Sequence, residues 1–97
     1  MLSIMLAVVM SVSPQIALFS GSTKVTVTVN LEGYPVDAWK IEWMDGSASS
    51  QSSEIIEDFT RTHTYRRAGE YPVTVLLYRN GKVVKALSRM VVLKGMS

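Results

Sequence analysis

The chain contains no cysteine and a single histidine, His63, among its 97 residues. The absence of cysteine excludes disulfides, thiolate metal sites and a cysteine nucleophile. One imidazole leaves little material for a metal site or for a serine–histidine pair. The composition therefore predicts a non-catalytic domain, and we expect neither a metal nor a cofactor.

A strong excess of charge is also missing. Ten Lys and Arg residues against eight Asp and Glu residues give a formal net charge of +2. This balance does not predict nucleic-acid binding, which needs basic side chains clustered on one face. Apolar residues make up 47% of the chain, so the composition predicts one folded domain with a single core and not a disordered protein.

The first 23 residues carry no ionisable side chain. Within them, residues 1–13 show the period of two that is typical of a strand, with bulky side chains on one side: Leu2, Ile4, Leu6, Val8, Met10 and Val12. We favour an ordered apolar arm over residues 1–13, followed by a domain over residues 14–97. One alternative is a signal peptide over residues 1–22, although it has no basic start. A membrane anchor is the other alternative, but its apolar run is short and interrupted.

From residue 14 onward the patterns predict β-strands. Lys24–Asn30 and Ala38–Trp43 alternate apolar with polar residues, as half-buried strands do. Residues 46–53 are small and polar and predict an exposed loop, and residues 54–58 predict a short strand leading into residues 60–65. No segment shows helical periodicity with start and stop signals. About seven short strands predict an all-β antiparallel sandwich with the apolar arm as an addition.

Asn80-Gly81 lies between two β-strand patterns, which is a strong hairpin signal. A two-residue turn pairs Arg79 with Lys82, and this register predicts an apolar outer face made of Leu76, Tyr78, Val83, Leu87 and Val91. Because a solvated sheet face is normally polar, such a patch indicates a protein contact. Together with the arm residues Leu2, Ile4, Leu6 and Val8 it forms the predicted interface. Two alternatives stay open: the arm covers the patch, or the register differs by one residue and the faces exchange.

Three segments resemble one known family. Glu42-Trp43-Met44-Asp45-Gly46-Ser47, then His63-Thr64-Tyr65, then residues 68–75 are similar to motifs of the PKD (polycystic kidney disease) domain family. The resemblance covers roughly residues 14–93 and implies an immunoglobulin-like β-sandwich. The chain departs from the family pattern where Ile41 stands at the usual tryptophan, Trp43 at a phenylalanine and Met44 at a glycine.

The predicted structural core combines these motifs with the strand pattern. Gly69-Glu70-Tyr71 fits a tyrosine corner, whose phenol bonds back to nearby backbone. The predicted core residues are Trp39, Ile41, Trp43, His63, Tyr65, Gly69 and Tyr71. The tryptophans could instead be exposed platforms for sugar, but we favour the core because they share a strand face.

Other chemistry is less favoured. We expect His63 to make a structural hydrogen bond. Asp45 with Glu42 supplies too few oxygens for Ca²⁺. Arg61, Arg66 and Arg67 form a basic cluster, for which phosphate or an acidic partner is the alternative to a solvated loop.

The sequence therefore predicts a non-catalytic structural protein that docks onto a larger assembly. A virion component (capsid decoration or tail) is the leading case, with other subunits, including further copies of this chain, as protein partners. The alternative is a secreted or cell-surface module, therefore extracellular, that binds carbohydrate or protein. A hydrolase ranks third because no catalytic constellation is present. We expect no nucleic-acid partner, and the pattern does not favour a membrane one.

Overall fold

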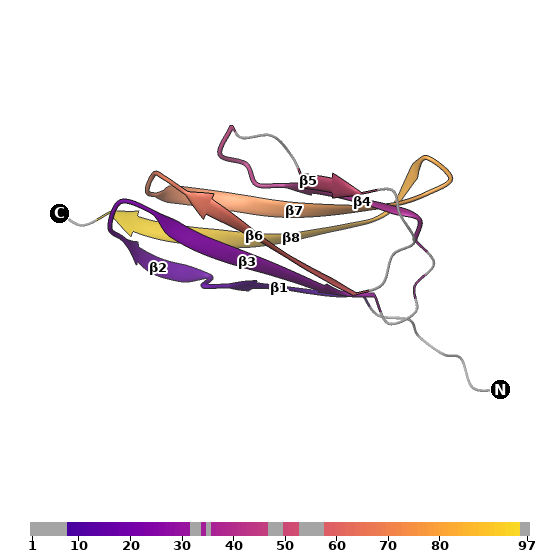
Figure 1. The fold of residues 1–97 in the computed structure, drawn as a ribbon, viewed down its shortest axis with the longest axis horizontal. Coiled ribbons are helices and arrows are strands. Elements are labelled where there is room, and N and C mark those ends of the chain that lie inside the picture. Colours follow the sequence, from indigo (N-terminus) through magenta and orange to yellow (C-terminus); the bar gives the residue numbers. More distant parts are fainter. Residues whose placement is uncertain (1–7, 32–33, 35, 47–49, 53–57, 96–97) are drawn as a thin grey trace.

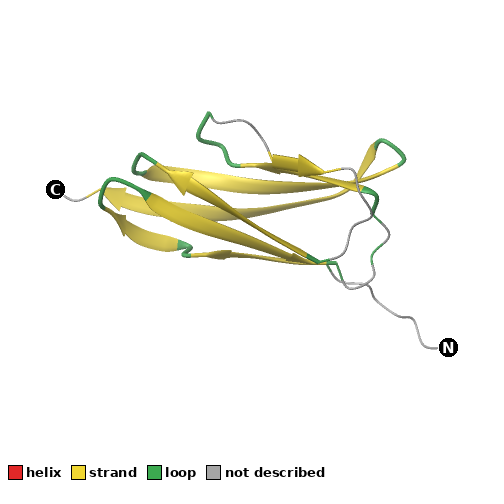
Figure 2. Ribbon diagram, viewed as in Figure 1, coloured by secondary structure: helices red, strands yellow, loops and turns green. Residues whose placement is uncertain are grey.

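The computed structural model describes residues 8–31, 34, 36–46, 50–52 and 58–95. These residues form two β-sheets that pack face to face as a sandwich (Figure 1). The described part of the chain contains strands and loops and no helix (Figure 2). The predicted all-β sandwich is confirmed.

The smaller sheet has three antiparallel strands in the order β1-β3-β6. These strands are β1 (Val9–Ser13), β3 (Thr23–Asn30) and β6 (Phe59–Tyr65). The valine alternation predicted for β3 is confirmed, because Val25, Val27 and Val29 are fully buried. The residues of β3 that alternate with these valines face outward and are polar, as expected of a sheet with one solvated face.

The larger sheet has five strands in the order β2-β8-β7-β4-β5. These strands are β2 (Ile16–Phe19), β8 (Lys82–Gly95), β7 (Gly69–Arg79), β4 (Ala38–Glu42) and β5 (Ser50–Ser52). All neighbours are antiparallel except β2 and β8, which run parallel. The sandwich is therefore antiparallel apart from this one pair of described strands, which arises because the chain crosses from the small sheet to the large one between β1 and β2.

The described part of the predicted arm belongs to the sandwich. Strand β1 pairs with β3 along its whole length, and the Met10 side chain is 2% exposed. Val8 and Val12 pack against the core while Val9 is exposed, so the predicted alternation is confirmed over residues 8–13. The predicted boundary at residue 14 therefore lies between two strands. Leu2, Ile4 and Leu6 lie outside the described residues.

The polar loop predicted over residues 46–53 contains a strand. Ser50–Ser52 forms β5 and pairs with β4 through the register Trp39↔Ser52 to Ile41↔Ser50. Backbone hydrogen bonding to the open edge of β4 decides this pairing, and a run of serines gives no alternation that could signal it. Of the strand predicted over residues 54–58, only Asp58 is described; it lies before β6, and its Oδ1 accepts the N–H of Leu31 at 2.8 Å.

The core lies between the two sheets and continues to both ends of the sandwich. Val73, Val75 and Leu77 of β7 are fully buried opposite the valines of β3. Trp39 of the large sheet stacks on Phe59 of the small sheet, with ring centroids 4.4 Å apart. The guanidinium of Arg61 lies over the Trp39 ring, 4.9 Å from the ring centroid. This aromatic bridge joins the two layers at the edge formed by β6 and β4.

Candidate functional site

The predicted docking face is only partly where the sequence placed it. The Asn80-Gly81 turn is confirmed, since both residues have positive φ and Arg79 pairs with Lys82. Beyond Tyr78↔Val83, however, Leu77 pairs with Lys85. A β-bulge therefore inserts one extra residue into β8, and every later residue of β8 turns to the opposite face.

The bulge corrects two residues of the predicted interface. Val91 is fully buried and Leu87 is half-buried against the core, so both face inward. Leu76 and Tyr78 are half-buried on the outer face and Val83 is 50% exposed, as the prediction placed them. Val8 packs against the core, and the other arm residues of the predicted interface lie outside the described residues.

An apolar strip nevertheless lies on the outer face of the large sheet, near its β2 edge. Ile16 pairs with Val92, Leu18 with Lys94, and Pro72 with Met90, and paired residues share a sheet face. The side chains of Ile16, Leu18 and Met90 are 66%, 70% and 45% exposed. We call these neighbouring residues the apolar strip: Ile16, Leu18, Pro72, Met90 and Val92. Sequence reasoning missed it because the bulge could not be seen in the hairpin pattern.

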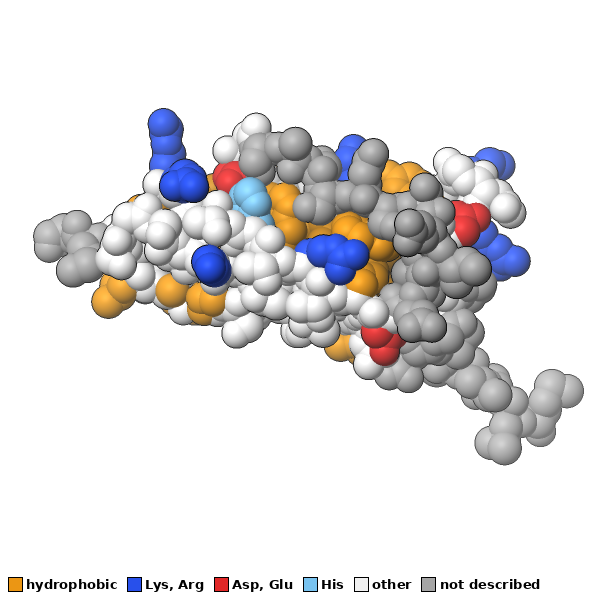
Figure 3. Space-filling view, in the orientation of Figure 1, with side chains coloured by type: hydrophobic (Ala, Val, Ile, Leu, Met, Phe, Trp, Pro, Cys, Tyr) orange, Lys and Arg blue, Asp and Glu red, His pale blue; other side chains and the backbone are white. Residues whose placement is uncertain are grey.

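The outer face of the small sheet is polar instead. Thr28 lies between Ser11 and Thr60 in the sheet, and Thr26 lies between Ser13 and Thr62. The threonine hydroxyls bond to one another across the strands, with Thr26 Oγ1 and Thr62 Oγ1 3.0 Å apart. Figure 3 views the molecule from this side, and most of the surface over β3 and β6 belongs to neither apolar nor charged side chains. This face is the solvated one.

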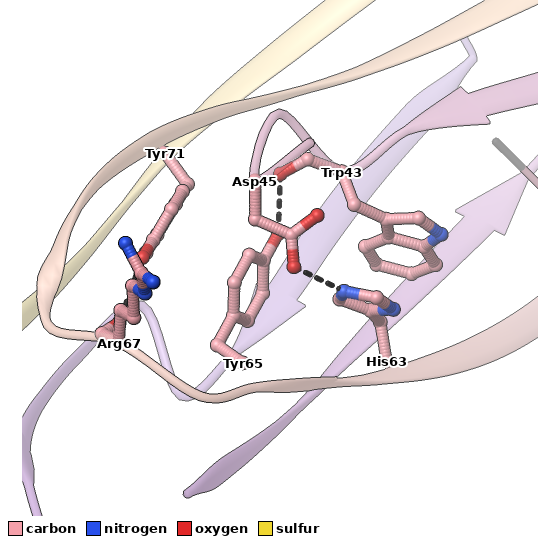
Figure 4. A network of polar contacts seen from close by, with 6 residues as sticks. All are labelled: Trp43, Asp45, His63, Tyr65, Arg67 and Tyr71. Carbon is pink, nitrogen blue, oxygen red and sulfur yellow. Dashed lines mark hydrogen bonds and ion pairs between the residues drawn. The ribbon is translucent and has the colours of Figure 1, made fainter. Parts of the chain in front are cut away.

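Five of the predicted structural core residues lie at the end of the sandwich where β6 turns into β7, namely Trp43, His63, Tyr65, Gly69 and Tyr71. Trp39 lies toward the other end, where it pairs with Leu77 and stacks on Phe59. Trp39, Ile41, Trp43, Tyr65 and Tyr71 are all buried, which confirms the core interpretation of both tryptophans. The hydroxyl of Tyr65 donates to the carbonyl oxygen of Trp43 at 2.7 Å (Figure 4). This buried bond joins a strand of the small sheet to the chain that follows β4 in the large one.

The environment of Tyr65 disfavours its ionised form. Burial raises the pKa of the Tyr65 phenol far above its ordinary value, and the negative charge of Asp45 raises it further. The neighbouring Tyr71 ring, stacked on Tyr65 with centroids 4.3 Å apart, acts in the same direction. The phenol therefore stays a hydrogen-bond donor to Trp43.

Tyr71 forms the predicted tyrosine corner. Its hydroxyl donates to the carbonyl oxygen of Arg67, four residues earlier, at 2.7 Å. A Cβ at Gly69 would lie 3.3 Å from this hydroxyl oxygen, tighter than ordinary packing, which is why the corner has a glycine there. The bond holds the turn between β6 and β7 against the core.

His63 makes the predicted structural contact, and its partner is Asp45. His63 Nε2 and Asp45 Oδ2 are 2.6 Å apart, with side chains 19% and 17% exposed. The imidazole stacks on Trp43 with centroids 4.8 Å apart and meets the edge of Tyr65 on its other side. Because His63 pairs with Val25 in the sheet, its side chain points inward and closes this end of the core.

The predicted basic cluster divides into two parts. Arg61 lies over Trp39, whereas Arg66 and Arg67 line a pocket of about 370 Å³ at the turn between β6 and β7. The same pocket is lined by Asp45, His63, Thr64 and Tyr71. In Figure 3, acidic and basic side chains lie near the histidine at this end of the molecule. The pairing of Asp45 with His63 was not foreseen, because 18 residues separate them in sequence.

Within the described residues, no group of three or more His, Cys, Asp or Glu side chains is placed to hold a metal ion. The same part of the chain contains no helix long and apolar enough to span a membrane. No family model matches the chain, and neither a curated protein nor a solved structure shows significant similarity to it. The resemblance to the PKD family therefore stays a prediction.

Proposed function

We propose that this protein is a non-catalytic structural subunit that docks onto a larger protein assembly, with a virion decoration, capsid or tail protein as the leading case. The observation that supports this proposal is the apolar strip. Leu18 and Ile16 are about two-thirds exposed on an edge strand, in a segment without charged residues. Exposed apolar side chains that lie next to one another on a sheet face are typical of protein contacts.

The occupant of the strip is a neighbouring protein subunit. Edge strands are normally protected from other chains by charged residues, proline or short length. Strand β2 is short and follows Pro14, but it carries no charge. The nearest charges on the same face, Lys94 opposite Leu18 and Glu70 opposite Val92, have opposite signs. An apolar centre with charges of both signs at its rim is typical of an interface with another protein. The rim charges would fix the orientation of that partner.

Photo-crosslinking in the native source tests the proposal. A benzophenone amino acid at Leu18 is expected to link the protein to one assembly component, whereas the same group at Thr28 on the hydroxyl face is expected to give no such product. The double variant Ile16→Thr and Leu18→Thr should weaken binding to the purified assembly by at least about tenfold, since it removes two large apolar contacts.

Val9→Thr is the matched control, because Val9 is 51% exposed but lies on the outer face of the small sheet. It should bind the assembly as tightly as the wild type. Equal binding of the double variant, or equal crosslinking from both positions, would contradict docking through the strip.

The alternative is a secreted or cell-surface module that binds carbohydrate or protein, with residues 1–22 removed as a signal peptide. The observation that favours it is the polar pocket beside Asp45 and His63. Intact-mass measurement on native material separates the two functions. A chain that begins near Thr23 would lack β1 and β2, and with them Ile16 and Leu18 of the apolar strip. A chain that keeps residues 9–19 is the one that can dock by the strip.

A further inference from the structure

The pocket at the turn between β6 and β7 is lined by residues of both charges. Arg66 and Arg67 are the basic residues of its lining, and Asp45, His63 and Thr64 line it as well. Among the described residues the only ion pair joins His63 and Asp45. Neither arginine therefore has a carboxylate partner there, and both have exposed side chains.

The backbone of the turn and the Asp45 carboxylate are held in place by the aromatic end of the core. The Tyr71 hydroxyl fixes the Arg67 carbonyl at 2.7 Å, and Gly69 lets the Tyr71 ring approach the turn closely. On the other side, Asp45 is held by His63, whose ring lies between Trp43 and Tyr65. Figure 4 shows Arg67 beside Tyr71 and the Asp45–His63 pair across from them. A pocket whose turn and acidic group are already held in place loses less entropy on binding than one that its ligand must order completely.

We propose that this pocket binds one acidic sugar residue, a uronic acid. Its carboxylate faces Arg66 and Arg67, because guanidinium groups donate paired hydrogen bonds to a carboxylate. Its hydroxyls donate to the Asp45 carboxylate and exchange hydrogen bonds with Thr64. The volume of about 370 Å³ matches a group of the size of one sugar ring with its substituents.

The mixed lining favours a sugar acid over other anions. A simple oxyanion would use the two arginines and leave Asp45 as a repulsive charge within the same pocket. An acidic peptide would meet the same repulsion at each further carboxylate. A uronic acid carries one negative charge together with several hydroxyl donors, and hydroxyl donors are what an ionised carboxylate accepts. This site is separate from the apolar strip and does not depend on the docking function.

The test is a titration of isotope-labelled full-length protein followed by NMR, with three probes at the same ionic strength: glucuronate, glucose and inorganic sulfate. Glucuronate is expected to shift the amide signals of residues 64–69 and the ring signals of His63 with saturation in the millimolar range. Binding of glucose should be at least about tenfold weaker, because it lacks the carboxylate. Sulfate should also be at least about tenfold weaker, because it lacks the hydroxyl donors. Added salt should weaken glucuronate binding.

Variants connect the signals to the proposed contacts. Arg66→Gln combined with Arg67→Gln should weaken glucuronate binding at least about tenfold. Arg79→Gln, an exposed arginine at the far end of the hairpin, should leave it unchanged. The variant Ile16→Thr with Leu18→Thr should also bind glucuronate normally, so that failure of the docking proposal and failure of this one can be distinguished. Equal affinity for sulfate and glucuronate, equal affinity for glucose, or no effect of the arginine changes would overturn the proposal.

Discussion

The two sheets present the same kind of side chain to each other and different kinds to the outside. Inward, both carry fully buried aliphatic residues, such as Val27 on β3 and Val75 on β7. Outward, the small sheet carries threonine hydroxyls that bond to one another, and the large sheet carries the apolar strip. The core therefore accounts for the inner alternation on both sheets. The apolar strip on the outer face of the large sheet is not needed for folding, because a sheet face in contact with water is normally polar.

The outer faces differ between the two sheets, whereas the inner faces do not, so only the outer faces can distinguish one partner from another. An inward valine is explained by packing and says nothing about partners. Leu18, at 70% exposure, has no packing explanation within the described part of the domain. Substitutions on the two kinds of face test whether the inner faces form one core and whether the outer faces are independent of it.

Trp43→Ala should lower the free energy of unfolding by about 3–5 kcal/mol, because it removes a large side chain that is 1% exposed. Urea denaturation measures this loss. Val83→Ala, on an exposed side chain of the hairpin, is the control and should change stability by less than about 0.5 kcal/mol. A loss of similar size in both variants would break the distinction between inner and outer faces.

Tyr65→Phe should lower stability by about 1–3 kcal/mol near pH 7, because it leaves the buried carbonyl of Trp43 without its donor. The pKa of Tyr65 is raised in the folded state above the ordinary value of 10.0. The stabilisation is therefore complete below about pH 10 and is lost as the pH rises above it, when the unfolded chain ionises. Denaturation at several alkaline pH values should show the gap between wild type and variant closing. A gap that widens with pH would contradict the assigned donor role.

Asp45→Asn should cost at most about 1 kcal/mol, because the Asp45–His63 pair is partly exposed and water screens it. Thermal unfolding of the variant measures this cost. His63→Gln provides the matched change on the other partner. Two single losses that add in the double variant would show that the pair does not couple the turn after β4 to β6.

Thr26→Val should change stability by less than about 0.5 kcal/mol, because its bond to Thr62 Oγ1 is exposed. Leu18→Thr on the other outer face should be equally neutral for folding. The two variants should differ in association with the assembly, where only Leu18→Thr weakens binding. Denaturation together with an equilibrium binding measurement shows whether the outer faces differ in function while they are alike in stability.

Much of the fold could be predicted because it depends on residues that are close together in the sequence. Alternating valines predict β3, the Asn80-Gly81 turn predicts the hairpin, and the spacing Gly69-Glu70-Tyr71 predicts the tyrosine corner. Each pattern depends on side-chain period or on backbone angles of adjacent residues. The buried tryptophans followed from the same period, because Trp39 and Ile41 of β4 and Trp43 directly after it are all buried.

The candidate sites could be predicted only in part, because they depend on register and on distant contacts. One extra residue of β8 moved Val91 from the predicted outer face into the core and placed Met90 outside. Nothing in the sequence between Lys82 and Lys85 marks that bulge. Likewise the basic cluster was visible, but its division between Trp39 and the pocket required β6 to be placed against β3.

Apolar alternation and turn residues predict the all-β class and most of the buried residues, because both depend only on residues that are near one another in the chain. Tertiary structure alone decided that residues 9–13 and 16–19 belong to different sheets and that Asp45 meets His63. It also decided which residues of β8 face outward. These features arise from pairing between segments far apart in the chain, and a shift of one residue in that pairing exchanges the two faces of a strand.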